Sequence, residues 1–132
     1  MMKNYIFILV LTLLLSCTYN KGEVKPTKDC STVIPQTVSF SADIVPVLTQ
    51  NCATAGCHSG TAPKGNLNMD ANNAYAQLNK NGSGYINVSN PHNSILYISL
   101  VSTSDPMPPN GALDPCAVEL ILKWMSQGAK NN

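Results

Sequence analysis

Apolar residues along this chain fall into one long run near the start and several shorter periodic segments further on. The run covers residues 5–15, with Thr12 as its only polar member, and it follows a start that carries Lys3. It is too short to span a bilayer, which takes about 20 apolar residues, and it suits the core of a secretory signal. We therefore expect residues 1–16 to be a signal peptide rather than part of the fold.

Two helices are predicted in the first half of the remaining chain. In the first, Asp43 is placed to cap the helix, and Pro46 then falls in the first turn, where its missing N–H costs nothing. The second is predicted to run from Asp70, its expected cap, through Leu78. The apolar positions that recur at helical spacing in the first helix are Phe40, Ile44, Val47 and Leu48.

Residues 95–101 are rich in β-branched side chains, and by periodicity a buried strand fits them nearly as well as a helix. Asn93 or Ser94 is suited to cap a helix here, and Pro91 lies just outside it. These flanking residues favour the helix.

The C-terminal segment has the clearest helical pattern. Asp114 suits the N-cap position, Pro115 the first helical residue, and Gly128 the end of the helix. The predicted apolar face comprises Val118, Ile121, Leu122 and Met125, with Leu120 and Trp124 beside it.

Charge is sparse and balanced. The chain has eight lysines, no arginine and seven acidic residues, for a net charge of +1. Without arginines or a basic stripe, nucleic-acid binding is not expected. No Gly-rich phosphate loop or Ser-His-Asp set indicates hydrolytic catalysis. We expect residues 17–38 to be a polar tether, residues 39–129 one domain and residues 130–132 a tail.

The strongest chemical motif is N-C-A-T-A-G-C-H-S-G at residues 51–60. Cys52, Cys57 and His58 are what covalent haem attachment needs: two sulfurs for the two vinyl groups and an adjacent imidazole for the iron. The usual spacing leaves two residues between the cysteines, and here there are four. A local Cys52–Cys57 disulfide or a zinc site with a fourth ligand from elsewhere would use the same residues.

The other three cysteines are interpreted in the light of export. Residues 14–17, L-L-S-C, resemble the bacterial lipobox, so Cys17 is expected to be lipidated and to anchor the protein to a membrane. Disulfides persist outside the cytosol. If Cys52 and Cys57 bind haem, Cys30 and Cys116 remain as a pair, although four cysteines permit three pairings.

A second axial ligand is predicted from a proline-rich loop at residues 102–110. Met107 is its only large apolar side chain, and the prolines around it stiffen the backbone. A thioether held in this way suits the distal position of a c-type haem iron. Weaker candidates for that position are Met69, Met125 and His92, and Met107 could also simply fill a gap in the core.

A family resemblance covers residues 39–129. The chain contains, in this order, S-F-S-A-D-I-V-P-V-L-T-Q-N-C, G-C-H, G-N-L-N-M, N-S-I-L-Y, M-P-P and K-W-M-S-Q-G-A. This order resembles the small mono-haem cytochrome c domains related to the planctomycete-type group. The resemblance implies an all-α, class I cytochrome c-like bundle of about four short helices around one covalent haem c. It also implies thioethers at Cys52 and Cys57, with His58 proximal and Met107 distal to the iron.

These features predict a lipid-anchored c-type cytochrome that moves single electrons outside the cytoplasmic membrane, on the periplasmic or outer-membrane face. It would serve redox partner proteins and would not itself be an enzyme. Two alternatives stay open. One is an extracytoplasmic binding module stabilised by a disulfide or zinc, and the other is a haem enzyme or sensor with an open distal site.

Overall fold

A computed structural model describes residues 28–132, so the predicted signal peptide, Cys17 and the first part of the tether lie outside the described residues. It contains the helices α2 (Val45–Asn51), α3 (Ala74–Leu78), α4 (Ile95–Val101) and α5 (Pro115–Ser126). A π-helical turn, η1 (Phe40–Ile44), leads into α2, and short 3₁₀ turns lie at η2 (Lys64–Asn66) and η3 (Pro91–Asn93). Residues 28–132 form no strand, which confirms the all-α prediction.

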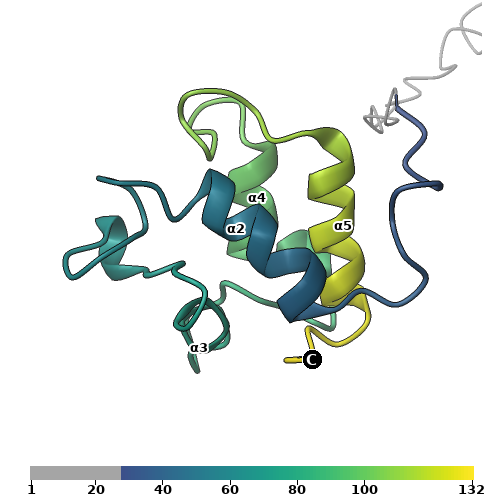
Figure 1. The fold of residues 1–132 in the computed structure, drawn as a ribbon, viewed down its shortest axis with the longest axis horizontal. Helices are drawn as coiled ribbons and strands as arrows, with labels where there is room; N and C mark the ends of the chain where they lie inside the picture. Colours follow the sequence, from purple (N-terminus) through teal and green to yellow (C-terminus); the bar gives the residue numbers. More distant parts are fainter. Residues whose placement is uncertain (1–27) are drawn as a thin grey trace, which may run out of the picture.

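The helices pack around one small core. In Figure 1, α2 lies between α5 on one side and the loop that leads to α3 on the other, and the chain ends near the start of η1. Phe40 lies at the centre, with its ring centroid 5.1 Å from those of both Tyr75 and Trp124. None of the helices in residues 28–132 has the length and apolarity needed to cross a bilayer.

The first helix begins earlier than predicted. Ser39 is the N-cap: its hydroxyl accepts from the Ala42 N–H at 3.2 Å. The Asp43 carboxylate accepts from the Ser39 N–H at 2.7 Å. Asp43 as the cap was therefore wrong, because a serine at a suitable position lies one turn earlier and the two side chains close the turn reciprocally.

The Asp70 prediction was also wrong at this level of detail. The α-helix begins at Ala74, and residues 71–73 form a turn before it. The Asp70 carboxylate does not cap α3. It accepts from the Gly60 N–H at 3.0 Å, because the loop before α3 folds back onto the Cys-His motif.

The predictions for α4 and α5 are confirmed. Residues 95–101 are helical, although the Ser94 hydroxyl accepts from the Asn87 N–H at 2.9 Å instead of capping the helix. Asp114 caps α5 by accepting from the Cys116 N–H at 2.8 Å, and Pro115 is its first residue. Trp124 is central to the buried face rather than beside it, since only 1% of it is exposed and its indole N–H donates to the Lys130 carbonyl.

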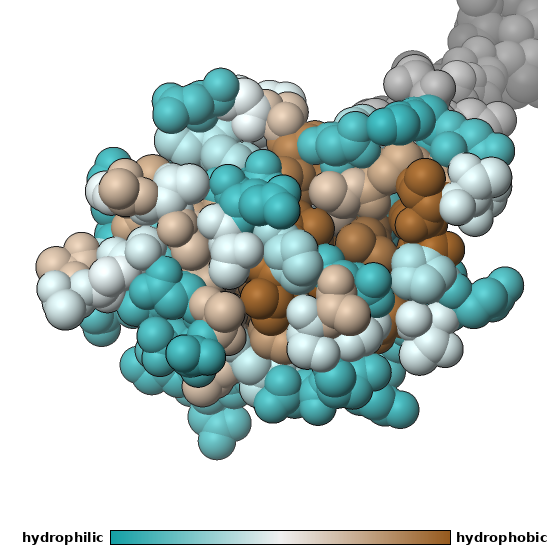
Figure 2. Space-filling model, in the orientation of Figure 1, coloured by the Kyte–Doolittle hydropathy of each residue, from teal (hydrophilic) through white to brown (hydrophobic). Residues whose placement is uncertain are grey.

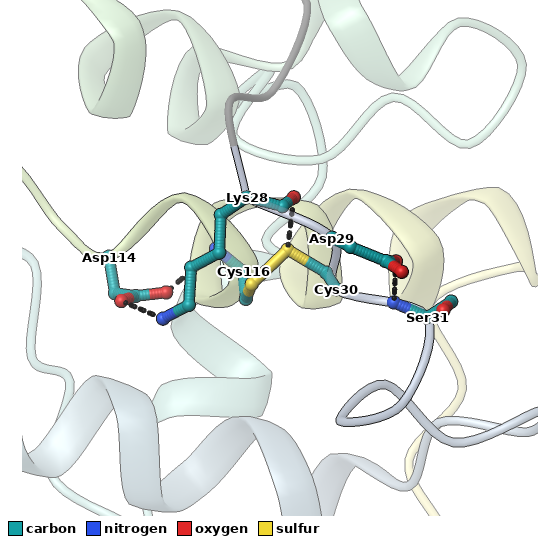
Figure 3. The surroundings of a disulfide bond; sticks show 6 residues. All are labelled: Lys28, Asp29, Cys30, Ser31, Asp114 and Cys116. Carbon is teal, nitrogen blue, oxygen red and sulfur yellow. Dashed lines mark hydrogen bonds and ion pairs between the residues drawn. A yellow bond between two sulfur atoms is a disulfide. The ribbon is translucent and has the colours of Figure 1, made fainter.

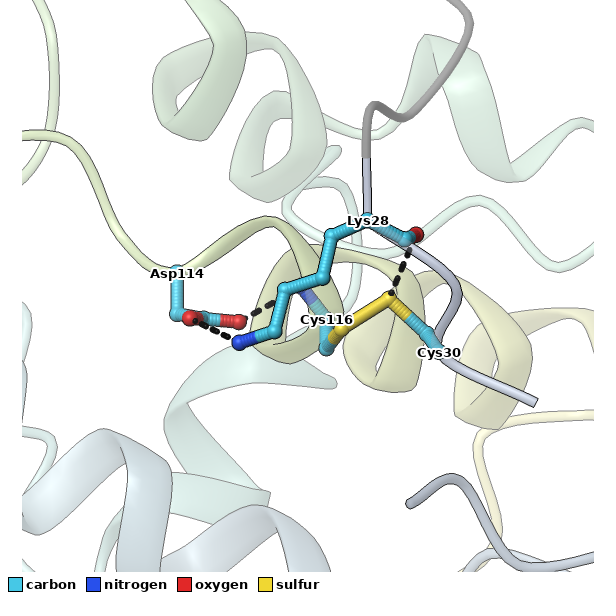
Figure 4. A network of polar contacts seen from close by, with 4 residues as sticks. All are labelled: Lys28, Cys30, Asp114 and Cys116. Atoms are coloured by element: carbon cyan, nitrogen blue, oxygen red, sulfur yellow. Dashed lines mark hydrogen bonds and ion pairs between the residues drawn. A yellow bond between two sulfur atoms is a disulfide. The ribbon is translucent and has the colours of Figure 1, made fainter. Parts of the chain in front are cut away.

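A disulfide joins Cys30 to Cys116, the pairing that the cysteine count favoured, and it attaches the chain before η1 to the first turn of α5 (Figure 3). The same Asp114 carboxylate that caps α5 pairs with the Lys28 ammonium at 2.8 Å (Figure 4). The Lys28 hydrogen bond, followed by the Cys116 N–H, lowers the pKa of Asp114 below its usual value. Both partners of this ion pair are about half exposed, so it adds little stability.

The described part of the predicted tether is packed on the domain. Val38 is buried, its N–H donates to the Gln127 side chain, and that side chain donates in turn to the Gln36 carbonyl. At the other end of the chain, the Asn132 carbonyl accepts from the Ser41 N–H at 2.9 Å. Residues in the ranges 28–38 and 130–132 therefore pack against the helical domain and are part of the folded unit.

Removing the disulfide should cost stability without changing the helices. In the chain-entropy model, a crosslink across a sequence separation of 86 residues stabilises by about 4.5 kcal/mol. We expect the variant with Cys30→Ser and Cys116→Ser to show a fall of this size in the free energy of unfolding, measured by denaturant titration. Wild-type protein kept reduced should match the variant, and an unchanged free energy would contradict the prediction.

Candidate functional site

The Cys-His motif forms a tight turn at the end of α2. The Cys52 N–H still donates to the Leu48 carbonyl at 2.8 Å, and the Cys52 carbonyl accepts from the His58 N–H at 3.1 Å. Inside this closure, the Cys57 N–H donates to the Thr54 carbonyl at 2.9 Å. The four residues between the cysteines thus lie within a turn that these hydrogen bonds close.

Gly56 is the residue that allows this loop. Its φ is +78°, a conformation that a side chain disfavours, and the surrounding space is open. The extra length relative to the usual spacing is therefore absorbed by a local turn, and Cys52, Cys57 and His58 stay within one segment of the structure.

Cys52 and Cys57 are free thiols, each partly buried. Burial, together with the neighbouring Cys57, raises the pKa of Cys52 to about 11, so this thiol is protonated at neutral pH. The predicted alternative of a Cys52–Cys57 disulfide is not formed in this structure. Within residues 28–132, no three His, Cys, Asp or Glu side chains converge as a multi-ligand metal site requires.

The His58 ring is held by the loop that follows it. Its Nδ1 lies 3.0 Å from the Lys64 carbonyl oxygen and 3.2 Å from the Leu67 carbonyl oxygen. Because both partners can only accept, Nδ1 must carry the proton, which leaves the lone pair on Nε2. This is the tautomer that an axial iron ligand needs. Sequence reasoning did not find these partners, since every residue has a carbonyl and only the folded loop selects two of them.

Met107 lies on a different element. Its side chain is partly buried, and its N–H donates to the Ser99 carbonyl of α4 at 2.9 Å, which fastens the proline-rich loop to that helix. The weaker candidates have other surroundings. Met69 and Met125 are almost completely buried in the core, and His92 is exposed, with its ring centroid 4.9 Å from that of Tyr97.

One face of α4 is apolar and exposed. Leu96 and Leu100 are buried, at 8% and 5% exposure. The opposite face carries three β-branched residues that are roughly half exposed: Ile95, Ile98 and Val101. Figure 2 views the molecule from the side on which α2 lies in front of α4, and it shows hydrophobic groups between hydrophilic ones, mostly toward α5. Two hollows in the described part of the chain lie elsewhere, one beside Lys80 and one beside Gln127.

An all-α domain with a Cys-His turn, a correctly protonated histidine and a separate methionine loop has the features of a cytochrome c-related domain. Comparison with known families supports this class: residues 55–111 match the family described as Planctomycete cytochrome C. The resemblance predicted from the sequence is therefore confirmed over residues 55–111, where the chain is similar to this family of cytochrome c-related domains. The matched range contains Cys57, His58 and Met107, and it excludes Cys52 and α5. Neither the curated proteins nor the solved structures include one that matches the chain.

Proposed function

We propose that this protein is a c-type cytochrome that carries single electrons outside the cytoplasmic membrane. In this proposal one haem is bound covalently through Cys52 and Cys57, with His58 and Met107 as the axial ligands of its iron. The bound haem would supply the redox chemistry by cycling between ferrous and ferric iron. The protein's own part is to hold the ligands, limit water access and offer a surface to partners.

The observation that carries this proposal is the state of His58. Its Nδ1 proton is engaged by the Lys64 and Leu67 carbonyls, so Nε2 is available as a ligand of fixed tautomer. A hydrogen bond at the far nitrogen also increases the electron donation of a ligating imidazole. Two free thiols within the same turn supply the sulfur atoms for thioethers.

The exposed face of α4 supports the proposal independently. Half-exposed isoleucine and valine side chains are stabilised when an apolar surface covers them. A porphyrin is such a surface, and the Met107 loop is fastened to the same helix. A small domain with few aromatic residues gains core material from a large apolar cofactor.

Membrane attachment is part of the proposal. Cys17 lies outside the described residues, and its lipidation is proposed from the sequence around it. The extracytoplasmic site is consistent with the Cys30–Cys116 disulfide, because such bonds persist where the environment is oxidising. The partners would be redox proteins on the same side of the membrane, and the protein itself would not be an enzyme.

The test is the visible spectrum of the protein produced in a host with cytochrome c maturation. We expect a haem spectrum that survives acid–acetone extraction, because thioethers resist this treatment whereas coordinated haem b is removed. A colourless protein, from a host that matures a control cytochrome normally, would contradict the proposal. Zinc analysis would then test the binding-module alternative.

A further inference from the structure

The loop from His58 to Asp70 contains polar contacts that the proposed ligands do not use. Two of them involve Gly60, and a third links Asn68 to Asp70. The Gly60 N–H donates to the Asp70 carboxylate at 3.0 Å, and the Gly60 carbonyl accepts from the Asn68 amide at 2.9 Å. The Asp70 N–H donates to the Asn68 side-chain oxygen at 2.8 Å. Both backbone groups of one glycine are thus held by two side chains that are themselves linked.

These contacts are anchored in the core through the residue between the two side chains. Met69 is buried, with 2% exposure, and its N–H donates to the His58 carbonyl at 2.7 Å. Residues 58–60 therefore lie against residues 68–70, with hydrogen bonds from His58 and from Gly60 to the second segment. Gly60 has a φ of +79°, which only glycine adopts readily, so the turn depends on this residue.

The same loop contains the carbonyls that hold the His58 ring. Lys64 and Leu67 lie in the chain between residues 58–60 and residues 68–70. The Lys64 N–H donates to the Cys57 carbonyl at 2.9 Å. The distance between the ring nitrogen and these carbonyls is therefore set by how tightly the loop is closed. If the hydrogen bonds at Gly60 are lost, the two ends of this loop are held together less firmly and the loop opens more easily.

We propose that Asn68 and Asp70 form a clamp on Gly60 that positions the His58 ring by keeping its Nδ1 bonded to the Lys64 and Leu67 carbonyls. Asn68 and Asp70 are positioning residues here, since they act on His58 through the backbone. The inference rests on the proposed function only where it concerns the iron. The geometry of the His58 ring is a property of the protein itself.

The clamp and a simple charge effect predict different results. Asp70→Ala removes a negative charge and the acceptor for Gly60, whereas Asp70→Asn removes the charge and keeps an acceptor oxygen. Asn68→Ala removes the other half of the clamp and changes no charge. Glu119→Ala, at an exposed position on α5, is the control for losing an acidic residue.

The first readout is the exchange rate of the His58 Nδ1 proton, measured by nitrogen-15 NMR in the full-length protein. We expect Asn68→Ala and Asp70→Ala to speed this exchange about fivefold, the factor that corresponds to losing a hydrogen bond of ordinary strength. Asp70→Asn and Glu119→Ala should exchange at the wild-type rate. The clamp is wrong if Asn68→Ala exchanges like wild type, or if Asp70→Asn and Asp70→Ala cannot be told apart.

The second readout is the reduction potential of the haem-loaded protein. A weaker Nδ1 hydrogen bond makes the imidazole a poorer donor to ferric iron, so the potential should rise in Asn68→Ala, where no charge has changed. A potential that follows charge alone, with both Asp70 variants raised equally and Asn68→Ala unchanged, would overturn the clamp. If the protein binds no haem, the proposed function has failed, and the proton exchange in the colourless protein still decides on the clamp.

Discussion

Replacing both Cys52 and Cys57 with alanine should reduce extraction-resistant haem to background. Without either sulfur no thioether can form, and any haem held by His58 alone should leave in acid–acetone. The measurement is the haem that stays with the protein after extraction, compared at equal protein concentration. Thr54→Ala is the matched control, because it lies in the same exposed loop and alters neither sulfur.

The two single variants test the four-residue spacing. If both cysteines are attached, each single variant should keep one thioether and one free vinyl group. The extra conjugation should shift its reduced absorption band to longer wavelength. A Cys52→Ala protein with the wild-type spectrum would instead mean that Cys57 alone is attached, and would contradict the two-thioether prediction. The result bears directly on Cys52, which lies outside the range matched by the family.

Replacing Met107 with leucine should open the distal coordination position while keeping an apolar side chain of similar volume. The weak band near the red end of the ferric spectrum, which reports sulfur bound to iron, should disappear. Added imidazole should then bind readily. The reduction potential should fall by on the order of 0.1 V, because a thioether favours ferrous iron and axial ligands tune haem over a range of about 0.8 V.

Met69→Leu is the control for this prediction, since it removes another thioether by the same substitution. Met69 is buried in the core, so the change should cost no more than about 1.5 kcal/mol of stability and leave the spectrum unchanged. A Met107→Leu protein that keeps the red band would show that another residue is the distal ligand. Ready binding of imidazole to the unaltered protein would favour the haem-enzyme alternative.

Local sequence patterns predicted a helix end well where the residues that cap the helix are close neighbours in the chain. At α5, Asp114 and Pro115 occupy the first positions as predicted, because capping is a contact between a side chain and an N–H two residues away. Asp43 and Asp70 show the limit of this reasoning. Each is an acid near a helix start, yet neither is the cap. The Asp43 carboxylate accepts from the N–H of the Ser39 cap, and the Asp70 carboxylate accepts from the Gly60 N–H.

The sequence alone determined the chemical inventory of this protein: two thiols and an imidazole within one short turn, a methionine stiffened by prolines, and two further cysteines suited to a crosslink. These follow from residue type and spacing. Only the tertiary structure decided which carbonyls accept from the His58 ring and which glycine is hydrogen-bonded by Asn68 and Asp70. It also decided which face of α4 stays exposed. The physical reason is that backbone groups are the same at every residue, so their partners depend on how the loop closes against the core.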